Sequence, residues 1–194
     1  MRGELTPDQC IAVKKYVIDM FEECEIHTLP IDPFEIAKKL YYVLRPYSSL
    51  TPEQLDEAWA ISGDAFSRVE RNPKTGMLEY VIYYNNWQIP NRIRWSLFHE
   101  IGHCYMGHHD HPDNSLLAIE EAEANLFAKY AIAPPPLIHV LGLQSGNDVA
   151  RAFHTSGIAG EHCFDYYRKW LRKGPKDYTD YERHLLSLFH VNVA

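Results

Sequence analysis

Residues 92–105 have the sequence RIRWSLFHEIGHCY, which contains the pattern H-E-x-x-H at positions 99–103. Side chains four residues apart on a helix project from the same face, so His99 and His103 can present two imidazole nitrogens to one Zn²⁺. Glu100 points about 100° around the helix from His99, where it can reach a water molecule beside the ion rather than the ion itself. The spacing predicts a catalytic zinc site in which Glu100 is the general base.

The residues around this pattern predict a buried helix. Four apolar side chains recur at helical spacing and form one stripe: Ile93, Leu97, Ile101 and Cys104. The two histidines lie on another face, and buried histidines need partners. They could be core histidines paired with other side chains, but two at this spacing with a glutamate between them favour a metal site.

A third ligand is expected from the helical stretch 114–131, in which three glutamates compete. On a helical wheel Glu123 lies amid apolar positions, Glu120 lies at the edge of the same arc, and Glu121 shares its side with polar residues. A carboxylate within an apolar stripe is costly to desolvate unless an ion compensates its charge. We therefore expect Glu123 as the ligand, Glu120 as second choice or as acceptor for an imidazole N–H, and Glu121 on a solvated face. The alternative that all three form an acidic surface run near a helix start stays open.

A different third ligand follows from the longer pattern H-E-x-x-H-x-x-G-x-x-H, which is typical of metzincins. His109 occupies the last position of that pattern, but Met106 stands where the glycine is required and Gly107 comes one place late. His109 is therefore the weaker candidate. We expect His108, His109 and His111 in a polar loop after the helix, with His108 near the cleft.

Four segments together resemble a known family. They are R-x-R-x-x-L-x-H-E-x-G-H at 92–103, E-A-N-x-F-A at 123–128 with a proline after it, Y-Y-N at 83–85, and F-H-T-S-x-x-A at 153–159. In these motifs the chain is similar to the ImmA/IrrE family of intracellular metallopeptidases, and the similarity extends over most of its length.

The resemblance implies a gluzincin-like, zinc-dependent endopeptidase with His99, His103 and Glu123 as ligands and Glu100 as catalytic base. Family members typically cleave helix-turn-helix repressors of mobile elements or stress regulons, so a transcriptional repressor is implied as substrate and partner. Mn²⁺ or Fe²⁺ can use the same ligands as Zn²⁺. The alternative function is a non-catalytic protein that keeps this scaffold and binds a partner, either sequestering a repressor or acting as an antitoxin- or toxin-type protein.

The composition is that of an ordinary globular protein, with 46% hydrophobic and 23% charged residues among 194. The length predicts a single metallopeptidase domain over residues 1–175, with a C-terminal helix over 176–194 packed on it. The net charge of −7 argues against direct binding of nucleic acid or of an anionic membrane. We expect a cytoplasmic protein, because no apolar signal core or run of about 18 apolar residues occurs and the four widely spaced cysteines are typical of reduced thiols.

The rest of the chain predicts a mainly helical α+β fold, zincin-like, with a small antiparallel (or mixed) sheet beside the metal helix. Alternation over residues 78–84 predicts a strand with one buried face. The expected elements, in chain order, are capped helices beginning near residues 7, 33 and 52, a short strand over 41–44, a hairpin of 66–69 and 77–84, the metal helix, and helices over 114–131, 145–153, 156–172 and from 180.

Two further features leave alternatives open. Residues 149–159 faintly resemble a helix-turn-helix, but the second helix offers few cations for phosphate contacts, so we interpret the segment as tightly packed helices. A hydrogen-bond donor is also expected to stabilise the oxyanion of a tetrahedral intermediate. The candidates for that donor are Tyr105, Tyr130, His108 and His154.

Overall fold

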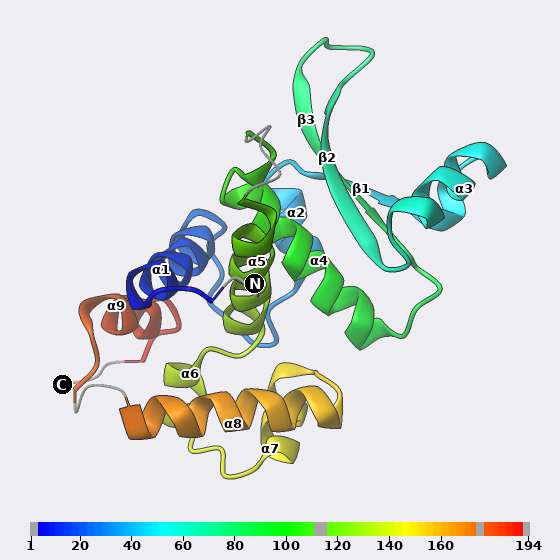
Figure 1. The fold of residues 1–194 in the computed structure, drawn as a ribbon. Helices are drawn as coiled ribbons and strands as arrows, with labels where there is room; N and C mark the ends of the chain where they lie inside the picture. The colour runs from blue at the N-terminus through cyan, green and yellow to red at the C-terminus, as the bar shows by residue number, and fades with distance from the viewer. Residues whose placement is uncertain (1–3, 111–115, 174–176, 192–194) are drawn as a thin grey trace. The chain divides into compact units, whose positions relative to one another are not determined.

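The computed structural model describes residues 4–110, 116–173 and 177–191 (Figure 1). The chain divides into two compact units, the first made of Met1–Pro7 and Asp32–Ala128, the second of Asp8–Ile31 and Lys129–Ala194. The fold is mainly helical α+β, as the sequence predicted. The expected division at residue 175 stays a prediction.

The first unit is built on a three-stranded mixed sheet with the strand order β1-β3-β2. Strand β1 (Val43–Pro46) is parallel to β3 (Leu78–Tyr84), and β2 (Ala65–Arg71) is antiparallel to it. The hairpin is confirmed, whereas β1 begins two residues later than the predicted strand. In Figure 1 the tip of the hairpin extends away from the helices of its unit.

The central strand β3 differs from the predicted strand with one buried face. Val81, Ile82 and Tyr83 are buried in succession. Val81 and Tyr83 pack into a cluster with Tyr47 and Ala58, and helix α4 packs against the sheet. Since successive side chains of a strand point to opposite faces, both faces of β3 are covered at its centre.

The described part of the first unit also contains four helices. Helix α2 (Pro33–Lys39) begins at Asp32, whose carboxylate accepts a hydrogen bond from the backbone N–H of Phe34 at 3.0 Å. Helix α3 (Pro52–Ile61) begins with a capping box between Thr51 and Gln54. These caps confirm the predicted helix starts. The other two are α4 (Pro90–Tyr105) and the part of α5 (Leu117–Ile132) up to residue 128, with short 3₁₀ turns η1 (Tyr47–Ser49) and η2 (His108–Asp110).

Gly102 allows α4 and α5 to approach closely. A Cβ at this position would lie 3.0 Å from the ring of Phe127 on α5. Phe127, Leu97 and Ile101 are fully buried, so this contact lies in the core of the unit. The glycine inside the H-E-x-x-H pattern thus brings the third-ligand helix against the metal helix.

The second unit consists of helices. Its helices are α1 (Pro7–Glu23), α6 (Pro135–Val140), α7 (Gly146–Phe153), α8 (Gly157–Lys173) and α9 (Asp180–Leu188), together with the end of α5. Helix α6 differs from the sequence-based expectation, in which Pro134–Pro136 only ends the preceding helix. Proline is well suited to a first helical turn, where its missing N–H has no intrahelical partner. The expected ends of the segments at residues 114–115 and 174–175 lie outside the described residues.

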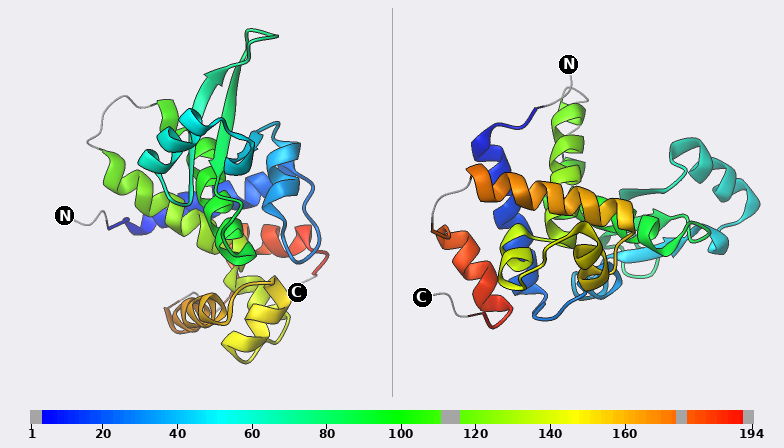
Figure 2. Two further views of the ribbon diagram at one scale, coloured as in Figure 1. Left: turned by 90° about the vertical axis from the view of Figure 1, so that its right-hand side faces the viewer. Right: turned by 90° about the horizontal axis from the view of Figure 1, so that it is seen from below.

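Helices α7 and α8 lie side by side (Figure 2). A Cβ on Gly160 would meet the backbone carbonyl of Gly146 and lie 2.8 Å from Cβ of Ala150. At this contact the two helices that include residues 149–159 pack tightly against each other. Helix α9 contacts α6, and Phe189 just beyond it packs on Phe21 of α1 with ring centroids 6.0 Å apart. Among the described residues, no helix combines the length and the apolar character needed to cross a membrane.

Candidate metal centre

Three side chains from two helices converge in the first unit: His99 and His103 of α4 and Glu121 of α5. The two Nε2 atoms are 3.1 Å apart, and the Glu121 oxygens lie 3.5 Å from His99 Nε2 and 3.4 Å from His103 Nε2. Ligand atoms held about 2.0–2.1 Å from one tetrahedral ion are about 3.3–3.4 Å apart. The donor set and its spacing therefore fit a single divalent ion such as Zn²⁺.

The carboxylate beside the two histidines is that of Glu121, and the ligand role expected for Glu123 stays a prediction. Oε2 of Glu123 instead lies 3.2 Å from Nε2 of His108. On a helical wheel Glu121 lies among polar neighbours, a pattern that is typical of a solvated face. Among them, Asn125 lines the same cleft as Glu121. The polar wall of a cleft therefore has the same sequence pattern as a solvated face.

Burial keeps both imidazoles neutral. Desolvation lowers the pKa of His99, although the nearby charge of Glu121 opposes the effect. Burial, together with the neighbouring His99, His108 and His109, lowers the pKa of His103 to about 3. Neutral imidazoles are the form that binds metal ions, so both are ready to act as ligands at neutral pH.

Glu100 is a buried carboxylate that α4 directs towards strand β2. Its Oε2 accepts a hydrogen bond of 2.6 Å from the hydroxyl of Ser67, and that hydroxyl lies 2.9 Å from Nε2 of His109. Burial raises the pKa of Glu100 to about 7, even though the Ser67 hydrogen bond acts to lower it. A carboxylate with a pKa in this range can accept and return a proton at neutral pH.

His108 and His109 occupy the 3₁₀ turn η2 directly after α4. His108 is buried, with its Nδ1 atom 2.9 Å from Nδ1 of His103, so it does not lie in the polar loop that we expected. His109 contacts Ser67 and lies outside the group formed by His99, His103 and Glu121. His111 lies outside the described residues.

These groups line a cleft of about 600 Å³. Its walls come from the start of β2, from α4 and from α5; the residues named above that line it are Ser67, His99, Glu100, His103, His108, His109, Glu120, Glu121 and Asn125. Of the four candidates for the oxyanion donor, His108 lines this cleft. Tyr105 packs against Phe127 instead, while Tyr130 and His154 belong to the second unit.

The start of α4 is fixed to the start of β2 by two polar contacts. Arg92 donates two hydrogen bonds to the carboxylate of Asp64, at 2.6 and 2.8 Å. The amide of Asn85, at the end of the Y-Y-N motif, donates to the carbonyl of Gly63 at 2.9 Å and accepts from the backbone N–H of Trp87 at 3.0 Å. The Arg92 contact holds the strand that carries Ser67 against the helix that carries Glu100, and the Asn85 contacts join the end of β3 to the segment before β2.

The comparison with protein families matches this part of the chain. The model of the Peptidase_M78 family, described as an IrrE N-terminal-like domain, matches residues 56–161, which is more than half of the chain. The matched range contains the H-E-x-x-H helix, Ser67, Glu121 and Glu123. No curated protein matches the chain significantly. The chain therefore belongs to the Peptidase_M78 family, the ImmA/IrrE metallopeptidases.

Proposed function

We propose that this protein is a zinc-dependent endopeptidase that hydrolyses a peptide bond in a regulatory protein, in the first instance a helix-turn-helix repressor. The convergence of His99, His103 and Glu121 beside a buried Glu100 is the observation that carries the proposal. A Zn²⁺ ion at this site would supply Lewis-acid chemistry, activating water and polarising the scissile carbonyl. Mn²⁺ and Fe²⁺ fit the same donors, and metal analysis of the purified protein distinguishes the three.

The proton transfers are assigned to Glu100. Its carboxylate accepts the proton of the attacking water and passes it to the amine that leaves. The hydrogen bond from Ser67 to Oε2 fixes the orientation of this carboxylate.

The cleft offers a place for an extended polypeptide. Strand β2 pairs with β3 on one edge only, within the part of the chain that the structure describes, and Ala65, Phe66 and Ser67 line the cleft. The backbone of an extended peptide can add to such an edge as a further strand. This geometry supports a protein substrate that presents a flexible or extended segment.

The charge of the cleft supports a basic substrate. Glu120 and Glu121 line it, and the chain has a net charge of −7. DNA-binding repressors carry basic surfaces, so electrostatic attraction should speed their association with this protein, and salt should weaken that effect. Cleavage rates that do not fall between low and high ionic strength would remove this part of the proposal.

The experiment is cleavage of purified helix-turn-helix repressors by the zinc-loaded protein, with the cut site found by mass spectrometry. Glu100→Gln is the matched control, because it keeps the shape of the side chain but removes the base. Cleavage by the parent and none by the variant supports the endopeptidase. If both proteins relieve repression equally and no fragment forms, the protein acts by sequestering its partner.

A further inference from the structure

Resting on the metal centre proposed above, we infer that His108 and Glu123 are positioning residues that orient His103. In this arrangement Glu123 accepts a hydrogen bond from Nε2–H of His108, and Nδ1 of His108 accepts one from Nδ1–H of His103. The Nε2 atom of His103 is then left with its lone pair directed at the ion. Glu123, which sequence analysis expected as a ligand, acts through two imidazoles instead.

The contacts form one continuous chain of atoms. The two Nδ1 atoms of His103 and His108 are 2.9 Å apart, and Nε2 of His108 is 3.2 Å from Oε2 of Glu123. The side chains of His108 and Glu123 are 6% and 20% exposed. Water is therefore a poor competitor for these hydrogen bonds, and their geometry is held by the protein.

The positions of the protons follow from the chemistry of the three groups. A neutral histidine that binds a metal through Nε2 carries its proton on Nδ1, so His103 must be the donor in the contact between the two rings. His108 then accepts at Nδ1 and carries its own proton on Nε2, facing Glu123. The carboxylate of Glu123 can only accept. Each contact has one donor and one acceptor, so the assigned protons satisfy both hydrogen bonds from His103 to Glu123.

A glycine places His108 over His103. Gly107 has φ of +73°, a left-handed conformation that turns the chain back directly after α4. The metzincin comparison found this glycine one position late. In this structure the turn at Gly107 brings His108 back against His103 of the metal helix. It does not direct His109 towards the ion, as the metzincin pattern would.

The two histidines of α4 have different neighbours: Asn125 acts on His99, whereas His108 lies against Nδ1 of His103. Nδ1 of His99 is buried and has no hydrogen-bond partner in the described parts of the chain. His103 alone of the pair has its outer nitrogen held by the chain of His108 and Glu123. Partners of this kind fix the tautomer and ring orientation of a ligand, and losing them typically weakens metal binding by 10–100-fold.

The test is the dissociation constant for Zn²⁺ of the full-length protein, measured by competition with a chromophoric chelator. We expect His108→Phe to raise the Kd by about 10–100-fold. His108→Asn should raise it less, since its amide oxygen can take the place of Nδ1 as acceptor. His162→Phe removes an exposed histidine of α8 and is the matched control, with no change expected. A Kd for His108→Phe equal to that of the parent overturns the inference.

A double-mutant cycle shows whether Glu123 acts on His103 through His108 or whether the two residues affect zinc binding independently. Glu123→Gln should weaken zinc binding in the parent and should have no further effect once His108 is Phe, because the link between them is already broken. If the losses of zinc affinity in the two single variants add up in the double variant, Glu123 does not act through His108. In the zinc-loaded protein, ¹⁵N NMR should show His103 protonated at Nδ1 and His108 at Nε2, a signature that a merely structural role would not produce.

The outcome also distinguishes this inference from the proposed function. If the parent protein binds no divalent ion, the metal centre itself is wrong. If the parent binds Zn²⁺ tightly and His108→Phe binds it equally well, the metal centre stands and only the role of His108 and Glu123 falls.

Discussion

The hydroxyl of Ser67 donates a hydrogen bond of 2.6 Å to Oε2 of Glu100 and so joins the edge strand β2 to the H-E-x-x-H helix. Hydrogen bonds to charged groups contribute about 1.5–3 kcal/mol. We expect Ser67→Ala to lower kcat/KM by about tenfold or more, because the carboxylate loses its orientation, while the Kd for Zn²⁺ stays unchanged. Ser67→Thr keeps the hydroxyl and should retain most of the activity. Equal losses in both variants would mean that strand packing, not the hydroxyl, is responsible.

Replacing Glu121 and Glu123 separately with glutamine identifies the third ligand. Glu121→Gln removes the negatively charged metal ligand beside the two histidines, so the protein should lose most of its bound Zn²⁺ after desalting. Glu123→Gln should stay metal-loaded, with the weaker affinity argued above. Metal content by mass spectrometry measures both. The opposite result would make Glu123 the ligand and would require a rotation of α5.

Glu100→Gln tests the base. The amide cannot accept the proton of water, so we expect hydrolysis to fall by about 10²–10⁴-fold. Metal content should not change, because Glu100 points towards Ser67 and is not one of the three converging donors. Peptidase assays beside metal analysis check the prediction, and a variant with parental activity would rule out Glu100 as base.

Gly102→Val tests the close approach of α4 and α5. The added side chain would press on the ring of Phe127, and such overpacking costs about 1–3 kcal/mol. Urea denaturation of the metal-free protein measures the loss. Adding Phe127→Leu removes the ring atoms that clash, so the double variant should be more stable than the sum of the two single changes indicates. Simple additivity would contradict the contact.

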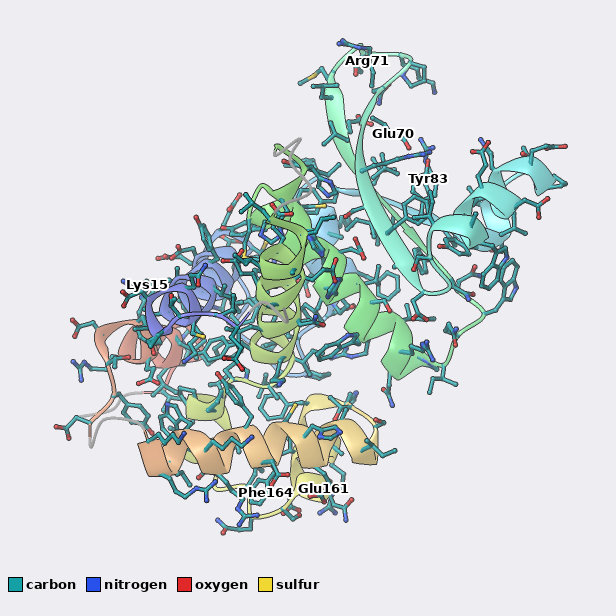
Figure 3. All side chains as sticks on the ribbon, in the orientation of Figure 1. Lys15, Glu70, Arg71, Tyr83, Glu161 and Phe164 are labelled. Atoms are coloured by element: carbon teal, nitrogen blue, oxygen red, sulfur yellow. The ribbon has the colours of Figure 1, made fainter. Side chains whose placement is uncertain are left out.

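Glu70 makes the stability of the hairpin depend on pH. Figure 3 labels Glu70 on β2 and Tyr83 on β3; the carboxylate accepts hydrogen bonds from Tyr83 at 2.6 Å and Arg68 at 2.5 Å, and Arg45 lies 3.3 Å away. Burial acts to raise the pKa of Glu70, but the hydrogen bonds and the two arginines outweigh it, so the pKa is lowered below 4.5.

A carboxylate with a lowered pKa in the folded state stabilises the protein above its unfolded pKa, and this stabilisation is lost as the pH falls through the folded pKa. At pH 7 the free energy of unfolding of the parent should exceed that of Glu70→Gln by about 1 kcal/mol or less, because Glu70 and its arginine partners are partly solvated. The difference should shrink as the pH falls below about 4.5. Denaturation curves at about pH 7, 5 and 3.5 measure this difference in unfolding free energy. A difference that stays constant with pH would contradict the lowered pKa of Glu70.

Local signals in the sequence predicted most of the fold. Thr51 with Gln54, and Asp32 with the proline after it, form the caps that the sequence predicted. The spacing of His99 and His103 was sufficient to place both imidazoles on one face of α4, since a helix fixes that relationship by itself. The hairpin was equally local, because its strands flank a turn that Asn72 and Gly76 stabilise.

The choice between Glu121 and Glu123 was not local. It depends on how α5 is rotated against α4, and the contact of Gly102 with Phe127 fixes that rotation. Ser67 gave no signal either, since a serine in a strand is unremarkable until the strand lies beside Glu100. In both cases the missing information was the packing of distant segments, which periodicity does not contain.

The three converging side chains differ in how far they are enclosed. Those of His99 and His103 are 16% and 13% exposed, whereas that of Glu121 is 55% exposed. An ion in this site would meet the solvent on the side of the carboxylate, so release of Glu121 is the first step by which it could escape. We expect the imidazoles to determine how firmly the ion is retained, and the carboxylate to determine how rapidly it is exchanged with the surrounding pool.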